Sequence, residues 1–205
     1  MKSKKNLLKE LEILPYFKKS TIVQLAKQIG LAPASVDTYI NRYLKNKEIV
    51  SLKKGLYVST NFFEKNKGQV AYSFYLANIV RSPSYVSSWT ALQYYGLATE
   101  AIHTITSVTP KLTRTYATKV GTFSFQSINK DLFSDFSLVP GTFDFFIASP
   151  AKALFDLLYY KTGQFRATKF KDIETIVDDA RIDLDEMAPA EKERFFTLIK
   201  TYCHE

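Results

Sequence analysis

Three features of the 205-residue sequence predict an α+β fold. Apolar residues recur at helical spacing through residues 3–45, and two short apolar runs joined by a basic turn follow them. Alternating, β-forming stretches then appear within residues 103–148, and helical patterns return from residue 150. We therefore expect a helical N-terminal segment that ends in a hairpin. A mixed α/β domain, with a small sheet flanked by helices, should follow it.

The first helix of the pattern in residues 20–57 has clear start and stop signals. Ser20 or Thr21 can cap it, because a hydroxyl accepts hydrogen bonds from unpaired backbone N–H groups. Gly30 is suited to end it in a left-handed conformation. Pro33 then fits the first turn of a second helix, where its missing N–H is not needed. The apolar face of the first helix consists of Ile22, Leu25, Ala26 and Ile29.

The second helix has an apolar face and a polar face. The apolar face, expected to be buried, carries Val36, Ile40, Tyr43 and Leu44. The polar face can donate hydrogen bonds to phosphates or base edges, and it carries Ser35, Thr38, Asn41, Arg42 and Lys45.

Two short apolar runs, residues 49–52 and 56–58, follow the second helix. Lys53, Lys54 and Gly55 join them, which predicts a hairpin with a basic tip. An amphipathic helix over residues 3–14 precedes the whole arrangement. Helix, turn, helix and hairpin in this order predict an N-terminal winged helix-turn-helix domain.

Positive charge is concentrated in this segment. Residues 1–60 hold 12 Lys and Arg against 4 Asp and Glu, whereas residues 61–205 hold 16 of each. The net charge of +8 therefore belongs entirely to the N-terminal segment, which favours binding to double-stranded DNA. The alternative is that these lysines only solvate a small helical domain. The candidate DNA-binding residues are Lys18, Lys19, Thr21, Ser35, Thr38, Asn41, Arg42, Lys45, Lys53 and Lys54.

Within this set, Arg42 is a candidate guanine reader and Asn41 a candidate adenine reader. A solvent-facing or phosphate-only role is the alternative for each. The lysines are expected to contact phosphate.

The predicted organisation is a DNA-binding domain in residues 1–60, a linker in residues 61–68 and an effector domain in residues 69–205. Phe62 and Phe63 are expected to dock from the linker onto one of the domains. The predicted helices of the effector domain are 69–80, 88–96, 150–160, 170–180 and 189–203, and its predicted strands are 103–108, 122–128 and 143–148. Lys152 and Asp156, four residues apart, are interpreted as an ion pair on the outer face of their helix.

No pattern indicates catalysis, a metal site or a cofactor. The two histidines, His103 and His204, lack zinc-site spacing, and no glycine-rich phosphate loop or Gly-x-Ser-x-Gly elbow is present. Cys203 is the single cysteine, so no intrachain disulfide is possible. No signal peptide or apolar run of membrane-spanning length is found. These features favour a cytoplasmic, non-catalytic protein without membrane contact.

Three segments resemble the AbiEi family, the antitoxin and transcriptional regulator of type IV, AbiE-type toxin–antitoxin systems. The first is the N-terminal module that ends in residues 54–57 (KGLY). The second is residues 88–97 (SWTALQYYGL) followed by 105–111 (ITSVTPK). The third is residues 147–156 (IASPAKALFD). The residues after 160 match no pattern of the family.

The resemblance implies autoregulation and antitoxin activity. The winged helix would bind inverted repeats in the operon's own promoter and repress transcription. The C-terminal domain would counter a nucleotidyltransferase-like toxin in an abortive-infection, phage-defence system, without a stable complex. One alternative is a stand-alone winged-helix regulator with a ligand-sensing or dimerising C-terminal domain. Another is an enzyme that acts on nucleic acid, which the missing acidic constellation disfavours.

Overall fold

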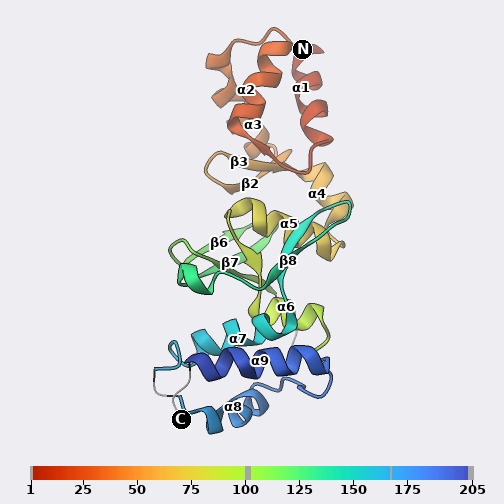
Figure 1. The fold of residues 1–205 in the computed structure, drawn as a ribbon. Helices are drawn as coiled ribbons and strands as arrows, with labels where there is room; N and C mark the ends of the chain where they lie inside the picture. The colour runs from red at the N-terminus through yellow and green to blue at the C-terminus, as the bar shows by residue number, and fades with distance from the viewer. Residues whose placement is uncertain (1, 100–102, 167, 203–205) are drawn as a thin grey trace.

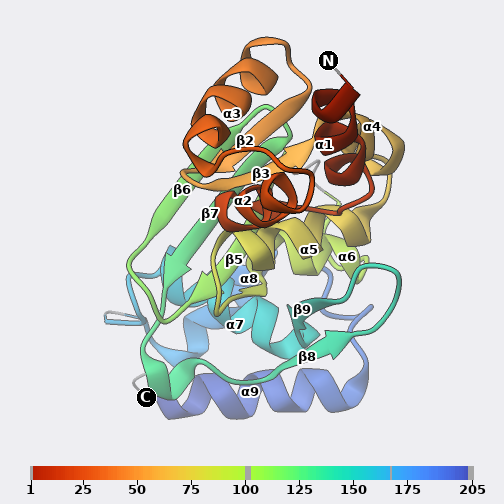
Figure 2. The same cartoon turned by 90° about the horizontal axis from the view of Figure 1, so that it is seen from above.

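The computed structural model describes residues 2–99, 103–166 and 168–202 and is of mixed α+β architecture. It is elongated, with N-terminal helices at one end, a six-stranded sheet in the middle and C-terminal helices at the other end (Figure 1). Viewed from the N-terminal end, α1, α2 and α3 stand in front of α5 and the sheet (Figure 2).

The N-terminal part contains the three predicted helices, α1 (Lys2–Glu12), α2 (Lys19–Gln28) and α3 (Val36–Lys45). A 3₁₀ turn, η1 (Pro33–Ser35), leads into α3. Their apolar faces form one buried cluster, which includes Leu7, Leu11, Ile22, Ala26, Val36, Ile40 and Tyr43. The periodicity therefore predicted these helices correctly.

The expected cap of α2 is wrong. Lys18 is the N-cap residue, and its backbone N–H donates a hydrogen bond of 3.4 Å to the Thr21 side-chain oxygen. Thr21 thus closes the first turn from inside the helix, and the start shifts toward the N-terminus. The predicted end is confirmed, because Gly30 follows the helix with a φ of 74°.

The predicted hairpin is present as β2 (Ile49–Lys53) and β3 (Leu56–Ser59). A third strand, β1 (Phe17–Lys18), was not predicted because it has only two residues. It pairs antiparallel with β3, and the order of the sheet is β1-β3-β2. This pairing brings the start of α2 beside the hairpin turn.

The predicted linker lies largely within a helix, α4 (Thr60–Asn66), whose first turn is capped by the Ser59 side chain. Phe62 docks as expected, since its ring centroid lies 5.5 Å from that of Tyr72 and 6.2 Å from that of Phe143. The helix that follows, α5 (Val70–Val80), is also as predicted.

One buried apolar cluster joins the hairpin to the C-terminal part of the chain. The hairpin contributes Leu52, Leu56 and Val58. The other buried members lie in or beside α5, β7 and β9: Tyr72, Leu76, Ala77, Val80, Phe123, Phe125 and Phe143. The Tyr72 hydroxyl also donates a hydrogen bond of 2.8 Å to the Pro15 carbonyl. The N-terminal part is therefore packed against the rest of the chain.

The larger sheet has the order β6-β7-β5-β4-β9-β8 and mixes parallel and antiparallel pairs. Its strands are β4 (Tyr85–Val86), β5 (Thr104–Thr109), β6 (Arg114–Thr118), β7 (Gly121–Ser127), β8 (Phe136–Val139) and β9 (Phe145–Ala148). β5, β7 and β9 were predicted, with small shifts at their ends. The edge strands β6 and β8 and the short β4 were not.

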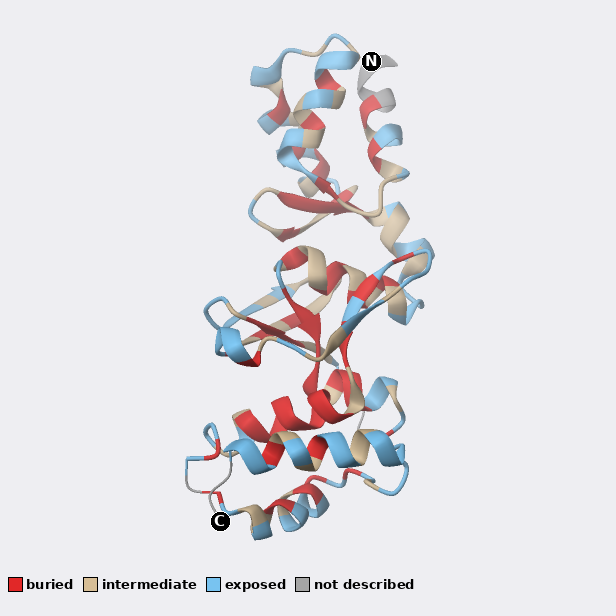
Figure 3. Cartoon of the chain, viewed as in Figure 1, coloured by how far each residue is buried: buried red, intermediate tan, exposed pale blue. Residues whose placement is uncertain are grey.

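The helices of the C-terminal end are α6 (Ser88–Tyr94), α7 (Pro150–Lys161), α8 (Ile173–Asp179) and α9 (Pro189–Tyr202). All four were predicted, although Cys203 and His204 lie outside the described residues. Short 3₁₀ turns, η2 (Lys130–Leu132) and η3 (Phe170–Asp172), precede β8 and α8. α7 is almost entirely buried (Figure 3).

The interpretation of Lys152 and Asp156 as a surface pair is wrong. Both are buried, at 1% and 0% exposure, and the Lys152 ammonium lies 2.5 Å from the Asp156 carboxylate. Asp156 also accepts hydrogen bonds from the Ser87 and Tyr85 hydroxyls, at 2.7 and 3.0 Å. Burial raises the pKa of the Asp156 carboxyl, although these three partners each act to lower it. Through these hydrogen bonds, Asp156 connects α7 to the segment that leads into α6.

None of the helices in the described ranges combines the length and the apolar character that a membrane crossing requires.

Candidate nucleic-acid interface

One side of α3 carries an exposed polar stripe. Thr38, Asn41, Arg42 and Lys45 are all exposed, and their spacing of three, four and seven residues places them on one helical face. Val36, Ile40 and Tyr43 are buried on the opposite face, as predicted. We call these four exposed residues the α3 stripe. Its amide and guanidinium groups can donate hydrogen bonds to base edges, and its cations can pair with phosphates.

The cations of the α3 stripe have no acidic partner among the described residues. Within the described part of the chain, neither Arg42 nor Lys45 forms an ion pair with a carboxylate. Their charge is therefore available to an external anion. Ser35, the other predicted member of this face, is only half-exposed because it belongs to the turn before the helix.

Lys19 is not available in the same way. Its ammonium lies 2.6 Å from the carboxylate of Asp37, in the first turn of α3, and both side chains are exposed. This ion pair ties the start of α2 to the start of α3. It also places a negative charge beside the α3 stripe.

The structure gathers the other predicted lysines at the hairpin turn. Lys18 pairs with Leu56 across β1 and β3, and the Lys19 backbone N–H donates to the Gly55 carbonyl at 3.0 Å. The starts of α2 and α3 and the turn at Lys54 and Gly55 therefore lie together. Thr21 is half-exposed, and its hydroxyl oxygen already accepts the capping hydrogen bond from Lys18.

Lys53 faces inward, contrary to its expected role as a phosphate contact. Its ammonium donates a hydrogen bond of 2.5 Å to the Val80 carbonyl at the end of α5. Burial lowers the pKa of this ammonium, and the positive charges of Lys111, Arg81 and Lys18 act in the same direction. Only Lys54 is exposed at the predicted tip.

These neighbours define a cluster of four cations at the junction between the hairpin and the C-terminal part: Lys18, Lys53, Arg81 and Lys111. Three of them are held by carbonyl oxygens instead of carboxylates. Lys53 donates to Val80, Lys111 to Ser82 at 2.6 Å, and Arg81 to Leu112. Because these acceptors are neutral, none of the three cations is neutralised by its hydrogen-bond partner.

Arg81 and Lys111 were missed as candidates. They follow α5 and β5, far along the chain from the basic segment, and only the packing of α5 and β6 against the hairpin brings them there. No local pattern of residues signals this arrangement.

The described residues offer no cluster of three or more His, Cys, Asp or Glu side chains that could hold a metal ion.

No protein-family model matches the sequence, and a search of curated proteins finds no significant match.

Proposed function

We propose that this protein is a DNA-binding transcriptional repressor whose recognition surface is the α3 stripe. The observation that carries the proposal is the exposure of Thr38, Asn41, Arg42 and Lys45 on one helical face, with no carboxylate partner for either cation among the residues that the structure describes. A helix of this kind fits the major groove, which is about 12 Å wide.

The N-terminal part serves as a winged helix-turn-helix in this proposal. α2 and α3 form the helix-turn-helix, and β2 and β3 form a short wing. Lys54 reaches phosphate from the turn of the wing, whereas Lys53 fixes the wing to α5. Lys18 starts α2 and Lys54 lies at the turn beside it, and in this proposal their phosphate contacts position the helix-turn-helix while Asn41 and Arg42 read bases.

The DNA partner in this proposal is the protein's own promoter, through inverted repeats. This choice comes from the resemblance to AbiEi proteins. A quantitative binding assay with the full-length protein tests it, using the fragment upstream of the gene and a shuffled fragment of the same composition. Preference for the upstream fragment supports autoregulation, whereas equal binding leaves only non-specific attraction.

We further propose that the C-terminal part is the antitoxin, acting against a nucleotidyltransferase-like toxin encoded beside it. The second and third of the segments that carry the resemblance contact each other, at Tyr95 and at Ser87, the residue just before the second segment. The Tyr95 hydroxyl donates to the Ala148 carbonyl at 2.9 Å, and Ser87 bonds to Asp156 at 2.7 Å. The shared residues are thus mostly scaffold, and neutralisation falls to exposed residues outside them.

The antitoxin role is tested by growth of cells that express the neighbouring gene. Co-expression of this protein should restore growth, and the Arg42→Ala variant should restore it equally, because α3 serves only repression. Growth arrest that neither protein relieves would remove the antitoxin role. A stand-alone transcriptional regulator would then be the better-supported function.

A further inference from the structure

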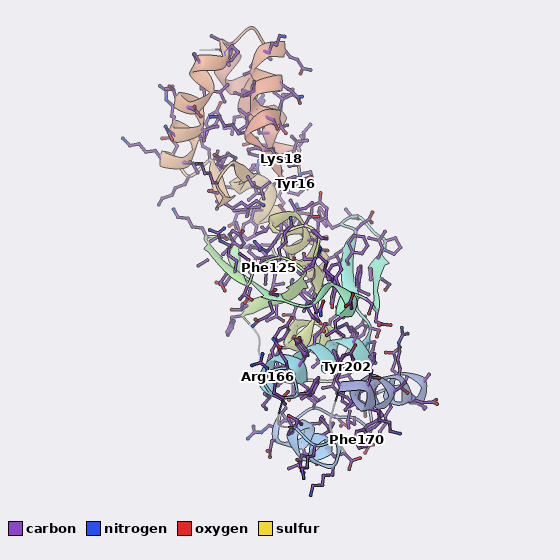
Figure 4. The ribbon with its side chains drawn as sticks, turned by 60° about the vertical axis from the view of Figure 1, so that its left-hand side comes forward. Tyr16, Lys18, Phe125, Arg166, Phe170 and Tyr202 are labelled. Atoms are coloured by element: carbon purple, nitrogen blue, oxygen red, sulfur yellow. The ribbon has the colours of Figure 1, made fainter. Side chains whose placement is uncertain are left out.

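A pocket of about 460 Å³ lies where the N-terminal part meets the large sheet. Tyr16 and Lys18 line it from the segment around β1, and Figure 4 shows both at the junction between the two parts. The rest of the lining comes from α5, residues 82–84, and residues in or beside β8 and β9. The volume falls within the range of roughly 300–1,000 Å³ that is usual for small-molecule sites. We call it the junction pocket.

The walls of the junction pocket are aromatic and incompletely covered. Tyr75, Phe136 and Phe146 line it, and Leu138 lies directly opposite Phe146 in the register of β8 and β9. Leu138 is 48% exposed and Phe146 is 40% exposed. Large apolar side chains adjacent to each other and open to solvent around a concavity mark a binding surface.

Two opposite charges line the same pocket without pairing to each other. In the described residues, neither Lys18 nor Asp144 forms an ion pair, and Asp144 accepts a hydrogen bond of 2.7 Å from the Gly141 backbone with one oxygen only. The pocket therefore offers an ammonium and a carboxylate oxygen beside an aromatic wall.

Ser84 adds a further polar group that lacks a partner. It lines the pocket at 5% exposure, and its hydroxyl oxygen has no hydrogen-bond partner within the described ranges. A buried hydroxyl without a partner is unfavourable, and a ligand that reaches this wall can relieve it.

We infer that the junction pocket binds a small aromatic zwitterion of the α-amino-acid class. The ring of the ligand packs against Phe146 and Tyr75, its carboxylate pairs with Lys18, and its ammonium pairs with Asp144. An uncharged aromatic molecule would leave both charged groups of the pocket unused. A simple aromatic acid would meet Asp144 with the wrong charge.

The ligand would also oppose DNA binding. Lys18 lines the junction pocket and is also one of the lysines expected to contact phosphate, so a ligand carboxylate would compete with phosphate for its ammonium. By linkage, DNA must weaken ligand binding by the same factor. This regulatory step rests on the proposed function, whereas the pocket itself does not.

Calorimetric titration of the full-length protein tests the pocket with three probes: L-phenylalanine, phenethylamine, which lacks the carboxylate, and 3-phenylpropionate, which lacks the ammonium. L-phenylalanine should bind at least roughly tenfold more tightly than either analogue, as expected for hydrogen bonds to charged groups. Phe146→Ala should weaken all three, because it removes the aromatic wall.

Two charge variants make the test specific. Lys18→Ala should abolish the preference for L-phenylalanine over phenethylamine, and Asp144→Asn should abolish the preference over 3-phenylpropionate. Lys54→Ala removes a nearby exposed charge outside the pocket and should change neither preference. Thermal unfolding of each variant confirms that it is folded. Failure of all three probes to bind at millimolar concentration overturns the inference. An order of probe affinities that stays the same in both Lys18→Ala and Asp144→Asn overturns it as well.

A second experiment distinguishes a failure of the pocket inference from a failure of the proposed DNA-binding function. DNA affinity is measured with and without saturating L-phenylalanine, and it should fall when the ligand is present. Ligand binding that leaves the DNA affinity unchanged overturns the regulatory step and keeps the pocket. If the protein does not bind DNA at all, the proposed function fails, while the calorimetric result still decides the pocket.

Discussion

The ammonium of Lys53 donates a hydrogen bond of 2.5 Å to the carbonyl of Val80, and this contact joins the hairpin to the last turn of α5. It turns one of the two lysines at the expected wing tip away from solvent. The hairpin therefore has a structural side, which faces α5 and β6, and one exposed lysine at its turn.

Lys54 and Lys53 should differ in their effect on DNA binding. Lys54→Ala should reduce the salt slope of binding by about 1, because it removes one phosphate contact. Lys53→Ala should reduce the slope by clearly less, because its ammonium is held by Val80. Salt titrations of both variants on one duplex provide the comparison, and equal reductions would contradict this assignment.

Asp37 should limit the affinity for DNA. Its carboxylate pairs with Lys19 and lies beside the α3 stripe. Asp37→Asn removes a negative charge and releases the lysine, so affinity should rise about threefold on all sequences, equivalent to less than 1 kcal/mol. Asp178→Asn, an exposed acid on α8, is the matched control and should have no effect. A loss of affinity in Asp37→Asn would show that the ion pair positions α3.

The cluster around Phe143 should make the N-terminal and C-terminal parts unfold together. Phe143 is 5% exposed and contacts the rings of Phe62, Tyr72 and Tyr75. Phe143→Ala should lower the free energy of unfolding by about 3–5 kcal/mol. Leu112→Ala, at a site that is 83% exposed, should change it by less than about 0.5 kcal/mol.

Urea unfolding followed by circular dichroism and by the fluorescence of Trp89 measures both values. The two signals should give coincident transitions in the wild-type protein. Two separate transitions would mean that the cluster does not couple the parts.

The buried ion pair between Lys152 and Asp156 should stabilise the fold only while both charged partners are present. Lys152→Met leaves Asp156 without its cation, and the free energy of unfolding should fall by about 3–5 kcal/mol. Changing Asp156→Asn together with Lys152→Met should lose less than the sum of the two single variants, since no unpaired charge remains buried.

The deficit in free energy of unfolding that Lys152→Met causes, relative to the wild-type protein, should also grow with pH. The pKa of Asp156 is raised, so its contribution to stability is present at low pH and is lost as pH rises through the folded pKa. Without Lys152 that pKa rises further, and ionisation of Asp156 becomes more unfavourable. The deficit, measured by urea unfolding, should be larger at pH 8 than at pH 5. The double variant lacks the titrating group, so its deficit relative to the wild-type protein should not grow with pH, and growth there would contradict the explanation.

Helices were the most predictable part of this fold. The apolar stripes of α2 and α3 and the Pro-initiated α7 have strong periodicity and clear end signals, and each forms close to its expected place. β6 was not predicted because its edge position leaves most of its side chains exposed, so no apolar alternation marks it. β4 is only two residues long and is defined by its neighbours in the sheet.

The errors at the level of side chains have a common origin in tertiary packing. Lys152 and Asp156 resemble a surface pair in sequence, but α6 and α9 cover α7 and bury them. Lys53 resembles a wing-tip lysine, but α5 approaches it from a distant part of the chain. Conversely, Asn41, Arg42 and Lys45 were predicted to be exposed and are exposed, because helical periodicity alone decides their orientation.

Base reading by α3 is tested most directly by comparing Arg42→Ala with Lys27→Ala, which removes one exposed charge from α2 instead of α3. Fluorescence anisotropy of the full-length variants measures affinity for the upstream fragment and for the shuffled fragment at several salt concentrations. Arg42→Ala should weaken binding to the upstream fragment by about 1–3 kcal/mol and narrow its preference over the shuffled fragment, while Lys27→Ala keeps the preference. If both variants keep the same preference as the wild-type protein, α3 does not read the operator.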